Sequence, residues 1–426
     1  MLDLHKSFGF KMNQIKIEEL AKLVLNGKIK FHEVENEVNG DSNLATIARR
    51  RALEQLLNLK LENIGKHSID FNSVVGRNIE NSIGAAQVPM GIAGPLKVNG
   101  DYAKGEFFIP LCTTEGALVA SVNRGCSAIT RSGGANSKVI RDVMTRAPLF
   151  KVPSLEHAEK LVEWVRENFG KVREAAEKTT RHGKLVEFEP YIVGTNVFLR
   201  FIFQTGDAMG MNMVTIACDE IRKLIEKECE YAKCVSLSGN VCVDKKASAM
   251  NLIRGRGKTV VAEAKIKRKI VEEVLKTVPE AICEVNWRKN YVGSALAGSY
   301  GFNAHYANVI AAIFIACGQD AAQVVESSMG ITTAELTEEG DLHLAVTLPS
   351  LEVGTVGGGT RLPTQSEALK ILGCYGGGNP AGFNAKKFAE IVAATVLAGE
   401  LSLLGALAAQ HLATAHLKLG RGKLKP

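Results

Sequence analysis

Two segments near the N-terminus carry apolar residues at the spacing of a helix face. Residues 14–29 and 44–58 repeat an apolar side chain every three or four positions, which is the period of an amphipathic helix. The second segment follows the run Asp41-Ser42-Asn43, and short polar side chains of this kind commonly cap a helix. We therefore predict a small helical N-terminal domain over residues 1–73.

A larger domain is predicted from strand and helix patterns that follow. Glycine and proline separate short apolar strands, and a long helix is expected between Thr114-Glu115 and Gly133-Gly134. Much later in the chain, Ala304–Cys317 and Ala385–Leu417 are rich in alanine and other apolar residues. This composition suits central helices that are packed on all sides. The predicted domain is a mixed α/β domain built from two stretches of chain, residues 74–147 and 249–426.

The intervening segment has its own order of elements. The pattern gives a strand, a helix, two strands, a helix and a final strand, at residues 149–152, 155–178, 184–193, 196–205, 213–233 and just after 233. The order β-α-β-β-α-β is that of a ferredoxin-like module. We predict that residues 148–236 form an inserted ferredoxin-like domain and that residues 237–248 form a connecting loop. The fold class of the whole chain is therefore predicted to be α+β.

Composition and charge exclude some classes of function. Of 426 residues, 46% are hydrophobic and 23% are charged, which is typical of a folded globular protein and excludes a disordered chain. The 52 Lys and Arg exceed the 45 Asp and Glu by seven, without the concentrated basic tracts of a nucleic-acid binder. We expect a phosphate-bearing small molecule as partner and no nucleic acid. The alternative from another class is an RNA-associated protein, for which the lysine-rich C-terminal tail is the support.

The cysteines and the N-terminus predict a cytoplasmic protein. The nine cysteines lie far apart and form no Cys-x-x-Cys pair, so we expect reduced thiols and neither a disulfide framework nor a metal site. The first residues lack the apolar run of a signal peptide. The longest uncharged stretch, Asn290–Gln319, is interrupted by polar residues, and we expect no membrane segment.

Two glycine-rich segments resemble nucleotide motifs only in part. Gly255 to Thr259 ends like a P-loop, but Leu252 stands where the first glycine is required. Gly376 to Ala381 spells G-x-G-x-x-A, but it follows a helical pattern rather than a strand and contains Pro380. Neither segment supports a P-loop or a Rossmann domain.

A better candidate for phosphate or dinucleotide binding is the segment Gly206 to Met213. It lies between a predicted strand and a predicted helix, and a helix N-terminus offers free N–H groups with a partial positive charge. The alternative is an ordinary loop in which Asp207 caps the helix.

Three charged residues are candidates for catalysis. Lys245 lies in a loop beside Asp244 and Lys246; it is either a solvated surface lysine or an ammonium that stabilises oxyanion charge on a carbonyl. Glu115 either complements a helix N-terminus or serves as a general acid. Asp320 directly follows a buried apolar helix, and a carboxylate there needs a partner, which predicts an ionic network.

The two histidines near the C-terminus are less informative. His411 and His416 are five positions apart, or ~140° around a helix, so they do not share a metal-binding face. Each is either a packed core residue or a catalytic group. No G-x-S-x-G segment supports a serine hydrolase.

Five longer motifs carry a family resemblance. They are Glu80 to Gly84, Thr113 to Gly116, Asp207 to Met213, Gly318 to Gln323 and Gly354 to Thr360. Together they resemble the hydroxymethylglutaryl-coenzyme A reductase family over about residues 74 to 420. The resemblance implies reduction of 3-hydroxy-3-methylglutaryl-CoA (HMG-CoA) to mevalonate and CoA with two NADPH, in the mevalonate pathway of isoprenoid biosynthesis. The alternative within this fold is an NAD-dependent enzyme that degrades mevalonate.

The resemblance also implies a role for individual residues. Lys245 would stabilise the substrate oxygens, Glu115 would supply a proton, Asp320 would join both into one network, and His416 would protonate the departing CoA thiolate. Asn308 would support Lys245. The carboxylate of the substrate is expected to bind Arg146, Ser238, Lys246 and Lys289, and the phosphates of CoA are expected to contact Ser121, Asn123 and Arg124. Because all four catalytic candidates are present, the resemblance disfavours an inactive scaffold.

Cofactor binding and assembly are implied in the same way. Asp207, Met209, Met211 and Asn212 would face the dinucleotide in the inserted domain, and Arg181 would meet the extra phosphate of NADPH. The Glu80 to Gly84 motif is expected in the interface of a homodimer with shared active sites, or of a tetramer. We expect no membrane anchor of the kind that some relatives carry, and the tail from Leu417 to Pro426 lacks their regulatory serine. We therefore expect a soluble enzyme without that switch.

Overall fold

The N-terminal unit is helical, and its core is small. A computed structural model describes residues 2–410. The chain forms two compact units, and the first of them is Met1–Pro89 with Arg361–Thr364. Its elements are α1 (Leu2–Leu25), η1 (Phe31–Glu33), α2 (Val34–Glu37), α3 (Ser42–Leu57) and α4 (Phe71–Val74). The side chain of Asp41 accepts N–H groups of Asn43 and Leu44, so the predicted cap of the second helix is confirmed.

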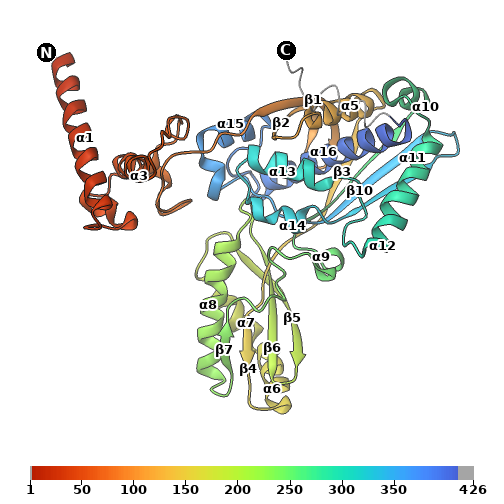
Figure 1. The fold of residues 1–426 in the computed structure, drawn as a ribbon. Coiled ribbons are helices and arrows are strands. Elements are labelled where there is room, and N and C mark those ends of the chain that lie inside the picture. The colour runs from red at the N-terminus through yellow and green to blue at the C-terminus, as the bar shows by residue number, and fades with distance from the viewer. Residues whose placement is uncertain (1, 411–426) are drawn as a thin grey trace. The chain divides into compact units, whose positions relative to one another are not determined.

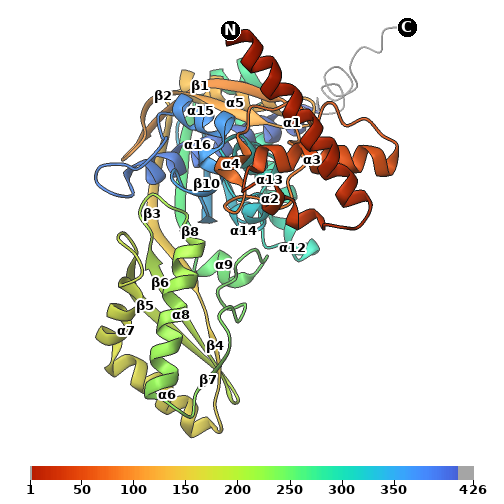
Figure 2. The ribbon, with the colours of Figure 1, turned by 90° about the vertical axis from the view of Figure 1, so that its left-hand side faces the viewer.

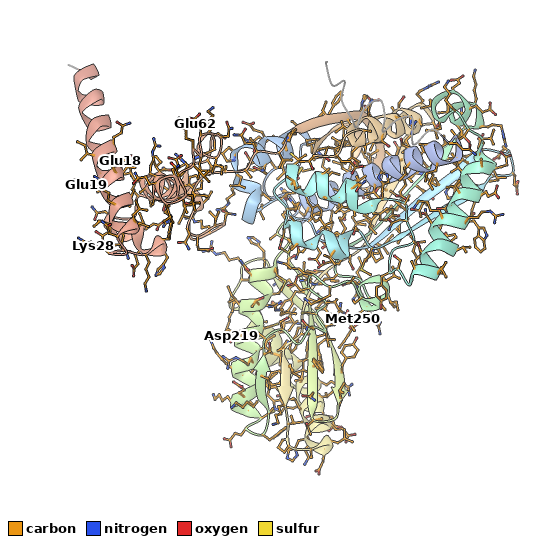
Figure 3. All side chains as sticks on the ribbon, in the orientation of Figure 1. Glu18, Glu19, Lys28, Glu62, Asp219 and Met250 are labelled. Atoms are coloured by element: carbon orange, nitrogen blue, oxygen red, sulfur yellow. The ribbon has the colours of Figure 1, made fainter. Side chains whose placement is uncertain are left out.

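The periodicity of α1 explains how this unit packs. Ile17 and Leu20 are buried, whereas Glu18 and Glu19 are exposed on the opposite face (Figure 3). Leu20 packs with Val34, Val38, Ala45 and Ala48 from the next two α-helices, which forms an apolar cluster. Burying one face of each helix in this way stabilises segments that would be marginal alone.

The second unit is organised around a ten-stranded sheet. The larger part of the sheet contains β1 (Met90–Gly100), β2 (Lys104–Cys112), β3 (Ala135–Arg146), β8 (Gly257–Ile266), β9 (Ile331–Leu336) and β10 (Leu342–Leu351). The order β3-β8-β10-β9 is antiparallel throughout, while β1 pairs with the start of β3 in parallel and with β2 in antiparallel register. The far end of β3 continues into the smaller part of the sheet (Figures 1 and 2).

Helices and short turns complete the larger part of this unit, except that Arg361–Thr364, at the end of η5 and the start of α15, belong to the first unit. The α-helices are α5 (Leu118–Arg131), α9 (Ala249–Ile253), α10 (Arg268–Ile270), α11 (Pro279–Val285), α12 (Ser294–Ala297), α13 (Tyr306–Ala316), α14 (Val324–Ser327), α15 (Pro363–Ile371) and α16 (Phe383–Ala408). The tighter or wider turns are η2 (Val271–Leu275), η3 (Asn286–Gly293), η4 (Ala321–Gln323) and η5 (Gly358–Arg361). The helix predicted from Thr114 begins only at Leu118, because Ala117 has a left-handed backbone (φ 76°).

Helix α16 is the central element, as its composition predicts. It packs against β3, β8, β10, α5 and α13, and nearly all of its residues are buried. It is also the one helix among residues 2–410 that is long and apolar enough to cross a membrane, but 83% of its apolar window is buried inside the protein. It ends at Ala408, nine residues before the predicted end at Leu417, and positions after 410 lie outside the described residues.

Two buried glutamates of α16 anchor neighbouring backbone. Glu390 accepts the N–H groups of Asp101, Tyr102 and Ala103 at the β1–β2 turn, at 2.7–3.1 Å. Glu400 accepts those of Ala304 and His305 just before α13. A buried carboxylate is tolerated when such bonds replace its hydration, so both side chains fix loops against the central helix.

The smaller part of the second unit has the predicted β-α-β-β-α-β order. Its elements are β4 (Leu149–Lys151), α6 (Leu155–Glu167), α7 (Phe169–Glu177), β5 (Lys184–Val193), β6 (Asn196–Gln204), α8 (Met211–Glu228) and β7 (Lys233–Ser236). The strand order β7-β4-β6-β5 is antiparallel, and the helices pack on a shared core with the strands.

Two helix boundaries in this module differ from the prediction. The helix predicted over residues 155–178 is broken at Asn168, whose side chain donates to the carbonyl of Trp164 and ends α6. The helix predicted from Met213 is α8, and it starts at Met211, because Gly210 supplies a left-handed turn (φ 95°). Small polar and glycine residues decide such ends locally, and the apolar period does not report them.

Candidate active site

The ammonium of Lys245 is paired with the carboxylate of Asp320. Nζ of Lys245 lies 2.9 Å from Oδ2 of Asp320, and both side chains are partly exposed. The other oxygen of Asp320 accepts the N–H of Ala322 at 3.0 Å and thereby caps η4. The hydrogen bond to Asp320 raises the pKa of Lys245. The structure therefore holds a protonated lysine against a carboxylate that is itself fixed by backbone.

Three of the sequence motifs meet beside this pair. The N–H of Gly354 donates to Oε1 of Gln319 at 2.8 Å, and the N–H of Thr355 donates to the carbonyl of Asp207 at 2.8 Å. A Cβ on Gly354 would come within 2.5 Å of the backbone nitrogen of Met209, so only glycine allows this approach. Segments that lie far apart in the chain thus form one backbone framework.

Glu115 has a different partner. Its Oε1 accepts a hydrogen bond from Nδ2 of Asn308 at 3.3 Å, and its side chain is exposed. Asn308 was expected to support Lys245, and the structure pairs it with Glu115 instead. The Glu115–Asn308 and Lys245–Asp320 contacts are two separate pairs in the described chain.

A cavity of about 510 Å³ gathers five of the predicted residues. Glu115, Ser121, Arg124, Lys289 and Asn308 line it, together with apolar residues of α5 and α16. A second cavity, of about 720 Å³, shares Lys289, His305 and Asn308 with the first and extends to Ala247. A concave surface with a few polar groups among apolar ones is typical of a small-molecule site.

Three of the residues expected to bind the substrate carboxylate lie around the loop of Lys245. Nη1 of Arg146 is 3.6 Å from Asp244, and Nζ of Lys246 donates to the Asp244 carbonyl at 3.2 Å. Oγ of Ser238 is 3.3 Å from Sγ of Cys242. The fourth residue, Lys289, is exposed and lines both cavities.

The three residues expected at the CoA phosphates point in two directions. Ser121 and Arg124 both bind Ser402 of α16, at 2.9 Å and 3.0 Å, and burial lowers the pKa of Arg124. Asn123 accepts the N–H of Gly94 at 2.9 Å. Ser121 and Arg124 therefore line the first cavity, whereas Asn123 faces β1.

The predicted cofactor loop is anchored at several points. Asp207 is 7% exposed, and its carboxylate accepts the N–H groups of Gly378, Gly382 and Ala385 at 2.8–3.0 Å. Its side chain thus binds the start of α16. The thioether of Met209 lies 3.6 Å from Nε2 of Gln323.

Two of the three remaining cofactor candidates lie at the first turn of α8. Asn212 is exposed there, and the sulfur of Met211 contacts Arg256 at 2.6 Å. Arg181 is exposed in the turn between α7 and β5. The neighbouring Thr180 contacts Sδ of Met213 at 3.1 Å, so the turn of Arg181 lies next to the start of α8.

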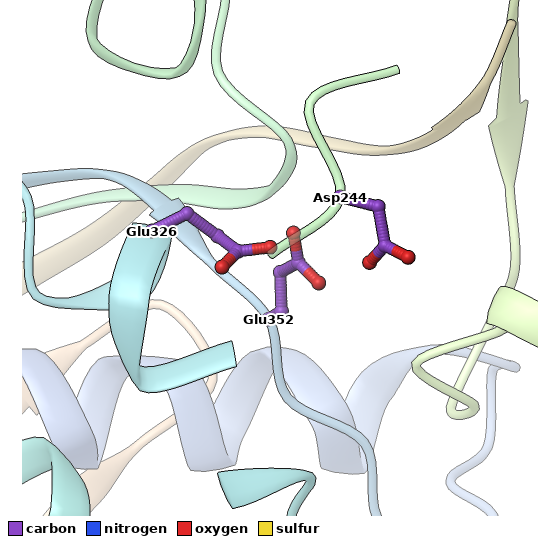
Figure 4. Close-up of side chains that lie close together, drawn as sticks. All are labelled: Asp244, Glu326 and Glu352. Carbon is purple, nitrogen blue, oxygen red and sulfur yellow. The ribbon is translucent and has the colours of Figure 1, made fainter. Parts of the chain in front are cut away.

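A buried charged cluster, which sequence analysis missed, adjoins the catalytic loop. Figure 4 shows the carboxylates of Asp244, Glu326 and Glu352, and one oxygen atom of each lies within 4.8 Å of one oxygen atom of the other two. The guanidinium of Arg256 contacts all three of them. Because Arg256 pairs with all three carboxylates, the cluster is an ion-pair network. Burial raises the pKa of Glu326, and it raises the pKa of Glu352 well above its usual range.

Comparison with known proteins gives the family. The family model for hydroxymethylglutaryl-coenzyme A reductase matches residues 45–421. The chain belongs to this family. The 3-hydroxy-3-methylglutaryl-coenzyme A reductases of Pyrococcus abyssi and Pyrococcus horikoshii are 62% and 63% identical to it over 408 residues, which cover 96% of this chain and 100% and 99% of theirs.

Solved structures of the reductase family support the same fold. A class II 3-hydroxy-3-methylglutaryl-CoA reductase from Streptococcus pneumoniae, described as bound to NADPH in open conformations, aligns with a TM-score of 0.61 at 20% identity. The alignment covers 84% of this chain and 82% of that one. The predicted α+β class is therefore confirmed, and family membership makes the chain an oxidoreductase.

One of the predicted catalytic residues is not among the residues that the structure describes. His416 lies outside the described residues, as does His411. Among described residues, the buried cluster was missed because each member looks ordinary in its own segment: Arg256 lies in the rejected P-loop spelling and Glu326 six residues after Asp320. The signal that could have indicated this cluster was the presence of charged residues inside apolar strand and helix segments.

Proposed function

We propose that this chain reduces HMG-CoA to mevalonate and CoA, a four-electron reaction that consumes two NADPH. The observation that carries the proposal is the Lys245–Asp320 pair, an ammonium held at 2.9 Å in a loop lined by the candidate anion-binding residues. A preorganised cation stabilises negative charge that develops on a carbonyl oxygen. Lys245 would do so at the thioester, the hemithioacetal and the aldehyde.

Proton supply falls to other residues of the same site. Glu115 lines the cavity of about 510 Å³ and accepts a hydrogen bond from Asn308, and it would give a proton to the substrate oxygen. His416 would protonate the CoA thiolate after the carbon–sulfur bond breaks. Asp320 would keep Lys245 charged throughout both reductions.

Positively charged and polar side chains would bind the anionic groups at both ends of the substrate. Arg146, Ser238, Lys246 and Lys289 would bind the carboxylate of the HMG group through charge-assisted hydrogen bonds. Ser121, Asn123 and Arg124 would contact CoA, of which the first and third line the cavity beside Glu115. Of these, Arg124 already has a polar partner in Ser402, which fixes the direction of its guanidinium.

The start of α8 suits a dinucleotide phosphate. This 18-residue helix has no side-chain cap, and Gly210 at its N-cap would place a Cβ 2.4 Å from Thr205 if it were substituted. Uncapped N–H groups with the nearby Arg181 form an anion-binding arrangement. NADPH, when bound, supplies the hydride for each reduction, and Arg181 would recognise its additional phosphate. A relative in Streptococcus pneumoniae is described as bound to NADPH.

Domains and assembly complete the proposal. Residues 148–236 would hold the cofactor, residues 74–147 and 249–426 the substrate, and residues 237–248 the catalytic lysine, with residues 1–73 as a helical N-terminal domain. A homodimer, or a tetramer of two dimers, would use the Glu80 to Gly84 motif, where Glu80 and Asn81 are exposed. All nine cysteines are unpaired, which suits the cytoplasm.

One assay tests the function. Purified protein should oxidise NADPH only when HMG-CoA is added, and two NADPH should disappear for each CoA released. The alternative is an NAD-dependent mevalonate-degrading enzyme, and a higher kcat/KM for NAD⁺ than for NADP⁺ in the oxidation of mevalonate with CoA would favour it. Absence of HMG-CoA-dependent oxidation with either nucleotide would refute both.

A further inference from the structure

The backbone of Lys245 has a conformation that its sequence does not favour. Its φ is 56°, in the left-handed region, and Val243 two residues earlier has the same φ. Residues with a side chain occupy this region at a cost and do so in proteins when their surroundings impose it. The loop must therefore be held by contacts that outweigh this cost.

Two fully buried side chains hold the loop. The N–H of Lys245 donates to Oε1 of Glu326 at 2.8 Å. Nδ2 of Asn251 donates to the carbonyls of Val243 and Lys246 at 3.1 Å and 2.7 Å. Glu326 and Asn251 are each 0% exposed, so these bonds form away from competing water and fix the backbone on both sides of the lysine.

Glu326 is itself fixed by the buried cluster of Figure 4. Nη1 of Arg256 lies 3.2 Å from the same Oε1 that accepts the lysine N–H, and Nη2 of Arg256 lies 3.1 Å from Asp244. Glu352 contacts the same Nη1 of Arg256 that pairs with Glu326. Burial raises the pKa of Glu352 and also that of Glu326, while the Arg256 guanidinium beside them acts in the opposite direction.

We propose that Glu326 is a positioning residue for Lys245: its carboxylate fixes the lysine backbone so that the ammonium meets Asp320 and the substrate oxygen. This inference rests on the proposed function, because it gives Lys245 the catalytic role. Glu326 acts through the lysine and does not touch the substrate. Displacing a reacting group by ~1 Å can cost ~10²-fold in rate, so loss of this anchor should lower kcat.

The test separates the effect of the length of the Glu326 side chain from the effect of its charge. Glu326→Gln keeps an oxygen at the same distance but removes the charge, whereas Glu326→Asp keeps the charge but is one methylene shorter. We expect Glu326→Asp and Glu326→Ala to lower kcat by about 10- to 100-fold for both HMG-CoA and mevaldehyde. Glu326→Gln should lose less than either. The KM for NADPH should change little in all three, because Asp207 anchors the cofactor loop to the backbone of Gly378, Gly382 and Ala385.

Glu390→Asp is the matched control. Glu390 is also 0% exposed and also accepts backbone N–H groups, but at the β1–β2 turn. It should lose thermal stability as Glu326→Asp does, without the loss of kcat per folded molecule. If Glu326→Ala fails to fold, the order of the kcat values of Glu326→Gln and Glu326→Asp still tests the positioning role.

Two results would overturn the positioning role alone. One is a wild-type kcat in Glu326→Ala or Glu326→Asp, and the other is a Glu326→Asp that retains as much kcat as Glu326→Gln. In both, an active wild type would leave the proposed function standing. A wild-type protein without HMG-CoA-dependent NADPH oxidation would instead overturn the function and this inference together.

Discussion

The side chains of Lys245 and Asp320 meet at 2.9 Å although 75 positions of sequence separate them. The lysine comes from the loop after the ferredoxin-like module and the aspartate from the turn after α13. Their contact brings a fixed positive charge to a region lined by candidate substrate residues, and the first two predictions depend on it.

Replacing Lys245 by Ala should abolish reduction of both HMG-CoA and mevaldehyde. The ammonium is proposed to stabilise oxyanion charge in both reductions, and loss of one such group costs ~10²- to 10³-fold in kcat. Steady-state rates with each substrate provide the measurement. Near-normal turnover of either substrate would return Lys245 to the role of a surface charge.

Asp320→Asn should shift the alkaline limb of the pH–rate profile to lower pH. The carboxylate raises the pKa of Lys245 through its hydrogen bond, so its removal makes the ammonium lose its proton earlier as pH rises. The same pair stabilises the fold below the unfolded-state lysine pKa of ~10.4, and this contribution is lost as pH rises through the folded-state pKa. The profile of kcat with mevaldehyde measures the shift, and an unmoved limb would contradict the assignment.

Arg181→Ala should reduce discrimination between the two nicotinamide cofactors. A guanidinium can form two charge-assisted hydrogen bonds with the 2′-phosphate of NADPH, which NADH lacks. The quantity to compare is the ratio of kcat/KM for NADPH over NADH in wild type and variant. An unchanged ratio would remove Arg181 from the cofactor site and leave the other assignments intact.

Asp207→Asn should destabilise the second unit. The carboxylate accepts three backbone N–H groups, one from the loop before α16 and two at its start, and an amide has one oxygen fewer to accept them. We expect a loss of about 1–3 kcal/mol in the free energy of unfolding, measured by urea denaturation.

The control for this change is Asp219→Asn. Asp219 lies on α8 (Figure 3) and forms surface ion pairs with Arg222 and Lys223. Exposed pairs of this kind contribute about 0–1 kcal/mol. Equal losses in the two variants would mean that the amide contacts of Asp207 carry no special stability.

His416→Gln should affect the thioester more than the aldehyde. A CoA thiolate, with a pKa near ~8.5, can add back to the aldehyde unless it is protonated, and an imidazolium is a suitable donor at neutral pH. Loss of a general acid lowers turnover by roughly 10²- to 10⁴-fold. Reduction of added mevaldehyde has no thiol to expel and should be largely retained. Parallel loss of both activities would indicate a structural histidine.

The sequence by itself predicts the kinds of element and the family. Apolar period and capping residues predict α3 and α16, and the β-α-β-β-α-β order predicts the inserted module, because these signals arise from neighbours within a few positions. The motifs around Glu115, Asp207 and Asp320 are contiguous, so they can be read without a structure. The break at Asn168 shows the limit, since one polar side chain ends a helix inside an otherwise continuous apolar period.

The tertiary structure alone decides which of these residues meet. It joins Glu326 to the backbone of Lys245 across 81 positions, Asn308 to Glu115 across 193, and Asp207 to the start of α16 across 171 to 178. Such contacts depend on how β3, β8 and β10 align and on how α16 crosses them, which no local period encodes. The burial that makes Arg256, Glu326 and Glu352 a charged network is likewise a property of the packed sheet and helices, because only the assembled core removes the water that would otherwise solvate each charge.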